Sequence, residues 1–134
     1  MYGPSITADT AKKIAPAAIA EAKKNNWTMA IAIVDTHGEL VYFERMDDVQ
    51  QGSVDVAVAK ARSAARFKRP TKTFQDGLAA GGAGLRLLSL EGAVPVEGGI
   101  PLVVGGKMIG AIGCSGATGA QDGIACMAGV NAVK

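Results

Sequence analysis

The first part of the chain has apolar residues at a helical period. Thr7 or Asp9 is suited to cap a helix that runs to about Lys24. The apolar residues of this helix share one face: Ile14, Ala18, Ile19 and Ala22. Pro16 lacks the backbone N–H that a helix interior uses, which predicts a kink near the third turn or a late start.

A hairpin and a second helix follow. Residues 28–34 are almost continuously apolar, which predicts a strand buried on both faces. A turn at residues 35–38 leads to a returning strand at residues 40–44. Ser53 is suited to cap a helix that Pro70 ends. Its predicted buried stripe consists of small and branched residues: Val54, Ala57, Val58, Ala61 and Ala65.

The segment between the second helix and the next strand has a weaker pattern. The pattern predicts a short helix at residues 74–80, followed by a flexible run at residues 81–84. The leucines that follow are expected to supply core, from a strand or a short helix: Leu85, Leu87, Leu88 and Leu90.

The C-terminal part predicts another hairpin and a last helix. Gly105-Gly106 is a two-residue turn between strands at residues 100–104 and 107–114. Gly110 and Gly113 weaken the second of these strands, so we expect another element to pack close to its backbone. A helix at residues 120–132 has three predicted buried positions: Ile124, Met127 and Ala128.

The order of these elements predicts an α+β fold, with helices packed on an antiparallel sheet. Nothing divides the 134 residues, so we expect one domain over residues 1–134. Hydrophobic residues make up 49% and charged residues 19%, which excludes a disordered chain. The formal net charge is +2 and no apolar run approaches about 20 residues, so neither nucleic acid nor a membrane is an expected partner.

The two cysteines and the N-terminus bear on the compartment. Cys114 and Cys126 do not have the spacing of a metal site, and free thiols are their expected state, although an oxidising compartment would allow a disulfide. No signal-peptide pattern is present, which favours a cytoplasmic location. A periplasmic or secreted location stays open, because Met1 could replace a removed signal peptide.

Blocks along nearly the whole chain resemble the GlcG/HbpS family, which is related to the C-terminal domain of PduO. Residues 35–40 with Arg45-Met46-Asp47 resemble the D-x-x-G-x-L…R-M-D signature. Residues 60–65 resemble the K-A-R-T-A helix, with Ser63 in place of Thr. The remaining blocks resemble E-G-G-x-P, I-G-A-I-G-V-S-G and a final Q-D: residues 97–101, residues 109–116 and Gln121-Asp122.

The resemblance implies a profilin-like fold, with a five-stranded antiparallel sheet flanked by helices in α/β/α layers. It also implies homo-oligomers, from dimers to octamers. Members of the family are haem-binding or corrinoid-related proteins, or accessory proteins of glycolate and diol catabolism. The chain departs from the pattern at Cys114, where Val is usual, and at Gly123, where Glu is common.

His37 and a row of arginines are candidate ligand-binding residues. His37, the one histidine, could be an axial haem ligand, although side chains in hairpin turns normally point to water. Arg62, Arg66 and Arg69 share a helix face and could hold carboxylates or haem propionates. A solvated face, or a contact with the acids of another subunit, is the alternative for these arginines.

Glycine-rich backbone forms a second group of candidates. Gly98 and Gly99, before Pro101, could present N–H groups to an anion, or could form a tight turn before a strand. Ser115 lies in a glycine-rich stretch that superficially resembles a phosphate loop. That stretch lacks the lysine and the spacing of such loops, so no nucleotide site is predicted.

Three residues are candidates for catalysis. Arg45 could orient a polar ligand, or it could pair with Asp35 or Asp47 to fix the hairpin. Asp35 or Asp122 could act as a general base if its side chain is buried.

Three functional hypotheses follow. The first is a small-ligand-binding protein for haem or another tetrapyrrole, with a pocket between the second helix and the sheet near a subunit interface. The arginines, Gly98-Gly99 and His37 would meet in that pocket. The alternative is a cofactor-independent enzyme acting on a small organic acid or carbonyl compound, in which Arg45, Arg62 or Arg66 holds the carboxylate. A purely structural, self-associating accessory protein is a further possibility.

Overall fold

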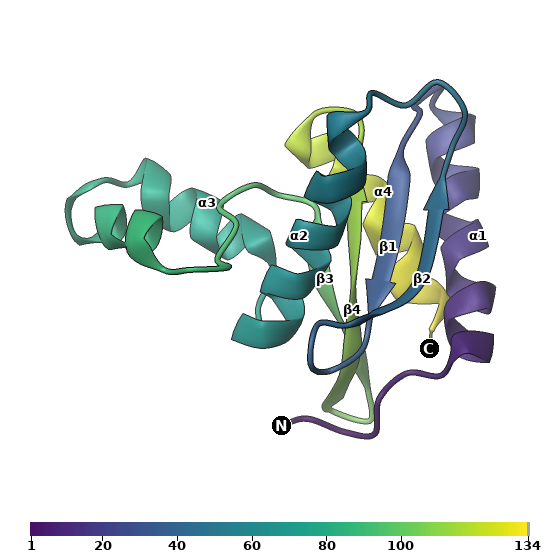
Figure 1. Cartoon of the computed structure of the whole chain (residues 1–134), viewed down its shortest axis with the longest axis horizontal. Helices are drawn as coiled ribbons and strands as arrows, with labels where there is room; N and C mark the ends of the chain where they lie inside the picture. Colours follow the sequence, from purple (N-terminus) through teal and green to yellow (C-terminus); the bar gives the residue numbers. More distant parts are fainter. Residues whose placement is uncertain (134) are drawn as a thin grey trace.

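A computed structural model describes residues 1–133, which form an antiparallel sheet with helices on both faces (Figure 1). The sheet of the described chain has four strands in the order β2-β1-β4-β3, with these bounds: β1 Ala30–Val34, β2 Leu40–Arg45, β3 Gly99–Val104 and β4 Lys107–Ser115. The helices are α1 Ala8–Lys24, α2 Gly52–Phe67, α3 Thr71–Ala79 and α4 Gly119–Ala132, with a 3-10 helix, η1, at Gly82–Ser89. In the described part of the chain, no helix combines the length and the apolar character that crossing a bilayer requires.

Both hairpins are confirmed, whereas the expected fifth strand is wrong. β1 pairs with β2 and with β4, and every residue of β1 is buried. The leucine-rich segment that could have supplied another strand forms η1. It begins at Gly82 and is preceded by Gly81, and the φ angles of these two residues are +58° and +71°. Such left-handed backbone suits glycine and interrupts the extended conformation that a strand needs.

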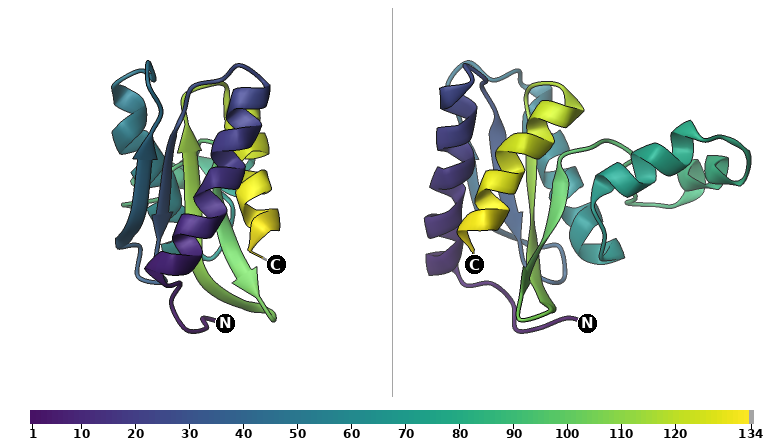
Figure 2. Two further views of the ribbon diagram at one scale, coloured as in Figure 1. Left: turned by 90° about the vertical axis from the view of Figure 1, so that its right-hand side faces the viewer. Right: turned by 180° about the vertical axis from the view of Figure 1, so that it is seen from behind.

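The sheet separates two hydrophobic clusters. α1 and α4 cover one face side by side, while α2 covers the other (Figure 2). Large aliphatic residues fill the α1/α4 side, among them Ile14, Ile31, Ile33, Leu102 and Ile112. On the α2 side the buried residues are mostly alanines: Ala30, Ala32, Ala57, Ala61, Ala64, Ala65 and Ala111. Small side chains let α2 lie close to the strands.

The close approach of α2 to the sheet depends on Gly113 in β4. A Cβ at this position would clash with the carbonyl oxygen of Ala57 and would lie 2.6 Å from the backbone nitrogen of Ala61. The expectation that another element packs against this strand is therefore confirmed.

The helix termini agree only partly with the sequence. Thr7 caps α1, because its Oγ1 accepts a hydrogen bond from the Thr10 N–H at 3.2 Å. α1 starts at Ala8 and contains Pro16, so a late start is wrong. Ser53 is not the cap of α2. It lies inside the helix, buried, and its Oγ accepts a hydrogen bond from Gln50 Nε2 at 3.0 Å.

α3 and η1 extend away from the sheet as an arm (Figure 1). The short helix predicted at residues 74–80 is present, and it begins earlier, at Thr71. The prediction that the leucines of this segment supply core is wrong. Leu88 is 70% exposed and Leu85 is 56% exposed, and no residue of η1 is buried. The arm therefore presents apolar side chains to the outside of the described chain.

The predicted buried face of α4 is also wrong. Ile124 is 52% exposed and Met127 is 44% exposed. The helix instead buries its other stripe: Asp122, Ala125, Cys126, Gly129 and Val130. Small residues on this stripe bring α4 near β4, where Cys126 meets Cys114.

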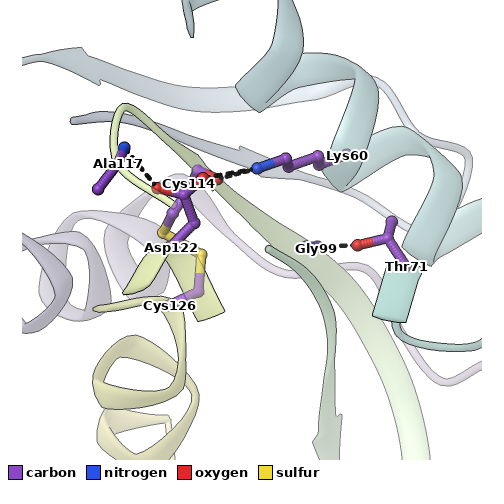
Figure 3. Close-up of a disulfide and its surroundings, with 7 residues drawn as sticks. All are labelled: Lys60, Thr71, Gly99, Cys114, Ala117, Asp122 and Cys126. Atoms are coloured by element: carbon purple, nitrogen blue, oxygen red, sulfur yellow. Dashed lines mark hydrogen bonds and ion pairs between the residues drawn. A yellow bond between two sulfur atoms is a disulfide. The ribbon is translucent and has the colours of Figure 1, made fainter. Parts of the chain in front are cut away.

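Cys114 and Cys126 form a disulfide, so the expectation of free thiols is wrong (Figure 3). The two Cα atoms are 5.7 Å apart, within the range that a disulfide spans. Both residues are fully buried. The bond fixes the middle of α4 against the end of β4.

A buried ion pair lies beside this disulfide and joins α2, β4 and α4 (Figure 3). Lys60 Nζ donates to Asp122 Oδ2 at 2.8 Å and to the Cys114 carbonyl oxygen at 3.0 Å. Asp122 Oδ1 accepts a hydrogen bond from the Ala117 N–H at 3.0 Å. The two side chains are only 1% and 3% exposed. Burial raises the pKa of Asp122 above its usual range, although the Lys60 ammonium and the Ala117 N–H oppose this shift.

Gly113→Ala tests the packing of α2. The added methyl group meets helix backbone that cannot move aside, so the free energy of unfolding should fall by about 2–4 kcal/mol. Gly52→Ala is the matched control, because nothing lies within 4 Å of a Cβ at Gly52 in the first turn of α2. Urea unfolding of both variants checks this. Equal stability of the two would contradict the contact.

Cys126→Ala tests the disulfide. Removing a bond that closes a loop with a sequence separation of 12 should lower the free energy of unfolding by about 3 kcal/mol. A reductant should destabilise the wild-type protein in urea titrations and leave Cys126→Ala unchanged. Intact mass after alkylation of the unfolded wild type would reveal two free thiols if no disulfide had formed.

Lys60→Met tests the ion pair through pH. Asp122 then loses the ammonium that opposes its raised pKa, so the folded variant retains a proton that the unfolded chain releases. Its free energy of unfolding should be highest below about pH 4, near the usual pKa of an aspartate, and should fall as pH rises through the raised pKa of the folded state. Urea titrations across this range should show a steeper fall than for the wild type, and Lys60→Met/Asp122→Asn should abolish the excess. A parallel profile for Lys60→Met and the double variant would argue against the pairing.

Candidate functional site

An apolar cavity of about 370 Å³ lies where the start of β3 meets α4 and the base of the arm. The exposed apolar stripe of α4 forms one wall, and Ile100 and Pro70 add further apolar surface. The lining residues are Pro70, Lys72, Glu97, Gly98, Gly99, Ile100, Ala120, Gly123, Ile124 and Met127. A ligand with a large apolar surface would find its contacts here.

Charged groups of both signs lie on this lining. Lys72 Nζ is 2.7 Å from Asp76 Oδ2, and this hydrogen bond raises the pKa of Lys72 above its usual range. Glu97 is held by its backbone N–H, which donates to Gln75 Oε1 at 2.8 Å. A cation and a carboxylate are therefore available beside an otherwise apolar surface.

Gly98 and Gly99 separate the cavity from the buried ion pair. A Cβ at Gly98 would lie 2.7 Å from Lys60 Nζ and 3.0 Å from Asp122 Cβ. Gly98 has a φ of +132°, which also favours glycine. The Gly99 N–H donates to Thr71 Oγ1 at 2.9 Å and is not free for an anion (Figure 3). Of the two glycine N–H groups considered for an anion, that of Gly99 is therefore used within the fold.

Gly123 enlarges the cavity, because it presents no side chain between Ile124 and Glu97. A Cβ there would come within 2.9 Å of Glu97 Oε2. A residue with a side chain would push Glu97 aside and reduce the space.

Arg62 and Arg66 line a different hollow, of about 350 Å³, together with Asp55, Val58, Ala59, Gly92 and Val94. Their guanidinium groups also fix the turn between β1 and β2. Arg62 Nε donates to the Gly38 carbonyl oxygen at 3.0 Å, and Arg66 Nε donates to that of His37 at 2.9 Å. The arginines were expected to meet Gly98-Gly99 in one cavity, and neither of these two hollows of the described chain brings them together.

His37 lies exposed in the β1–β2 turn and lines neither hollow. Asp35 Oδ1 accepts hydrogen bonds from the N–H groups of His37 and Glu39, at 2.8 and 3.0 Å. Asp35 thus shapes this turn.

The remaining candidates are dispersed. Arg45 lines a third hollow near Lys23 and Asp47, and within residues 1–133 it forms no ion pair with Asp35 or Asp47. Arg69 Nε donates to the Phe67 carbonyl oxygen, and its guanidinium lies over the Phe74 ring. Pro101 pairs with Ala111 inside the sheet, and Ser115 is buried where β4 pairs with β1.

Sequence reasoning missed most of the apolar cavity. Ile124 and Met127 were expected in the core, and Lys60 was not singled out from its motif. α4 has two apolar stripes, and the helical period does not choose between them. The pairing of Cys126 with Cys114 would have identified the buried stripe.

Comparison of this chain with known proteins identifies one family. Residues 6–131 match the family described as "Haem degrading protein HbpS-like". Protein GlcG of Escherichia coli strain K12 is 39% identical over 95 residues, which cover 71% of this chain and 69% of GlcG.

Two solved structures have the same fold. A double mutant of Streptomyces reticuli HbpS superimposes with a TM-score of 0.87 and 29% identity, covering 98% of this chain and 88% of that one. PduOC in complex with haem gives a TM-score of 0.85 and 26% identity, covering 96% of this chain and 94% of that one. The match over nearly all described residues shows that this chain belongs to the HbpS-like family, with GlcG among its relatives.

Proposed function

We propose that this protein binds haem or a similar tetrapyrrole in the apolar cavity between β3 and α4. The observation that carries the proposal is the pair of large apolar side chains, Ile124 and Met127, that α4 exposes toward this cavity beside Ile100. Exposed apolar groups that line a concave surface mark a binding site more often than scattered ones do. The haem complex of PduOC supports this ligand class for a protein of the same fold.

The lining fits a haem in chemical terms. Ile100 and Ile124 would contact the apolar macrocycle, and the Lys72 ammonium would attract a propionate. Among the described lining residues, Met127 carries a thioether, a known type of haem-iron ligand. Bound haem would supply an iron centre, and the chain's own residues would bind it and exclude water from one face.

The alternative of a cofactor-independent enzyme gains no specific support. Asp122 is enclosed by Lys60 and by the Ala117 N–H, and Asp35 is used within a turn. Neither carboxylate lines the apolar cavity.

Self-association stays a prediction. The leucines of η1 are apolar and exposed in the described chain, and a second copy covering the arm would remove them from water. The haem proposal does not depend on this, because the cavity is lined by residues of one chain.

A haemin titration followed in the Soret region tests the proposed function. We expect a saturable spectral change for the wild type. Ile124→Asp should weaken binding by about tenfold or more, because a carboxylate must lose water against an apolar ligand. Met127→Leu should retain binding with an altered Soret band if the thioether ligates the iron, and an unaltered band if Met127 contributes apolar contact alone.

His37→Ala is the matched control, because this exposed turn residue lies outside the cavity. It should bind haemin as the wild type does. A wild type without saturable change, or an Ile124→Asp variant that is folded by circular dichroism and binds normally, would refute the proposal.

A further inference from the structure

We propose that the hollow lined by Arg62 and Arg66 is a binding site for a small organic monocarboxylate, separate from the proposed haem site. The site lies on the outer surface of α2, facing the segment that joins η1 to β3. It does not share a lining residue with the apolar cavity.

Arg62 is a cation without a carboxylate partner among residues 1–133. It is half-buried, and its Nε is held at 3.0 Å by the Gly38 carbonyl oxygen. This bond orients the guanidinium and leaves its two terminal nitrogens without a hydrogen-bond acceptor in the described chain. A partly buried, oriented fork of donors is suited to a planar carboxylate.

Arg66 adds a second cation one helical turn further along. Its Nε is fixed by the His37 carbonyl oxygen at 2.9 Å. Its contact with Glu39 is long, at 3.6 Å, and both side chains are largely exposed. Such a surface pair is weak, so Arg66 can turn part of its guanidinium toward a ligand.

The walls of the hollow suit a short apolar body. Val58 and Ala59 lie on the α2 side, and Val94 lies opposite. The Val94 N–H donates to Ser63 Oγ at 3.0 Å, which anchors that wall to α2. The shape of the site is therefore fixed before a ligand arrives, which lowers the entropic cost of binding.

Asp55 determines which anions fit. It lines the same hollow, seven residues before Arg62, which places the two Cα atoms about 10 Å apart along the helix. A ligand with one carboxylate can place it at the arginines and its apolar end toward Asp55. A dicarboxylate of equal length would bring a second negative charge toward Asp55, and like charges repel.

Amide chemical shifts in an NMR titration test the site, with butyrate, succinate and neutral butyramide as probes. Butyrate should move the signals of Val58, Arg62, Gly92 and Val94 in a saturable way. Butyramide should not, and succinate should bind about fivefold more weakly. Arg62→Gln should weaken butyrate binding by about tenfold. Arg69→Gln, which removes an arginine outside the hollow, is the matched control and should bind normally.

Asp55→Asn is a second variant that tests the site even if Arg62→Gln does not fold. It replaces an exposed residue in the first turns of α2 and leaves the arginines in place. It should bring succinate binding close to that of butyrate. Equal shifts with butyrate and butyramide, normal butyrate binding by folded Arg62→Gln, or unchanged discrimination in Asp55→Asn would each overturn the proposal. Haemin binding is measured in a separate titration, so the haem proposal and the carboxylate proposal can fail independently of each other.

Discussion

The contact between Lys60 and Asp122 is the constraint on which the surrounding structure depends. Two opposite charges this deeply enclosed are stable only while every remaining donor and acceptor is satisfied. The Cys114 carbonyl oxygen and the Ala117 N–H meet that requirement, so the middle of α2, the end of β4 and the first turn of α4 must meet at one point. Residue 98 must then be a glycine, because a Cβ there would lie 2.7 Å from the Lys60 ammonium nitrogen. The glycine backbone that borders the apolar cavity at Gly98 is therefore a consequence of burying this ion pair.

The two hollows lie on different parts of the molecule and differ in chemistry. One is bounded by aliphatic and thioether groups of β3 and α4, and the other by guanidinium groups of α2. A single ligand that used the arginines and Gly98-Gly99 together would have to span both, and they have no lining residue in common. The arginines also hold the β1–β2 turn through carbonyl oxygens, so they act first as structural residues. Binding at their free nitrogens would add to that role.

Sequence patterns predicted the features that are set locally. The Gly105-Gly106 turn, the buried run of β1 and the Thr7 cap each follow from neighbouring residues, and all three are present. The orientation of α4 could not be predicted, because Ala125 and Cys126 compete with Ile124 and Met127 for the core. Long-range contact decides between them: small residues allow closer packing, and a disulfide completes it. The leucines of η1 were wrongly assigned to the core for a related reason. Hydrophobicity alone does not show whether the fold places another element against a given apolar side chain.

The enclosure of the disulfide has a consequence for how the protein meets a reducing environment. Both sulfur-bearing residues are fully buried between β4 and α4, so a thiol reagent cannot reach them in the closed structure. Cleavage has to wait until α4 lifts from the strand, a local opening with its own free energy. The rate at which a dilute reductant breaks this bond therefore reports the fraction of molecules in which that helix, and with it one wall of the apolar cavity, has opened.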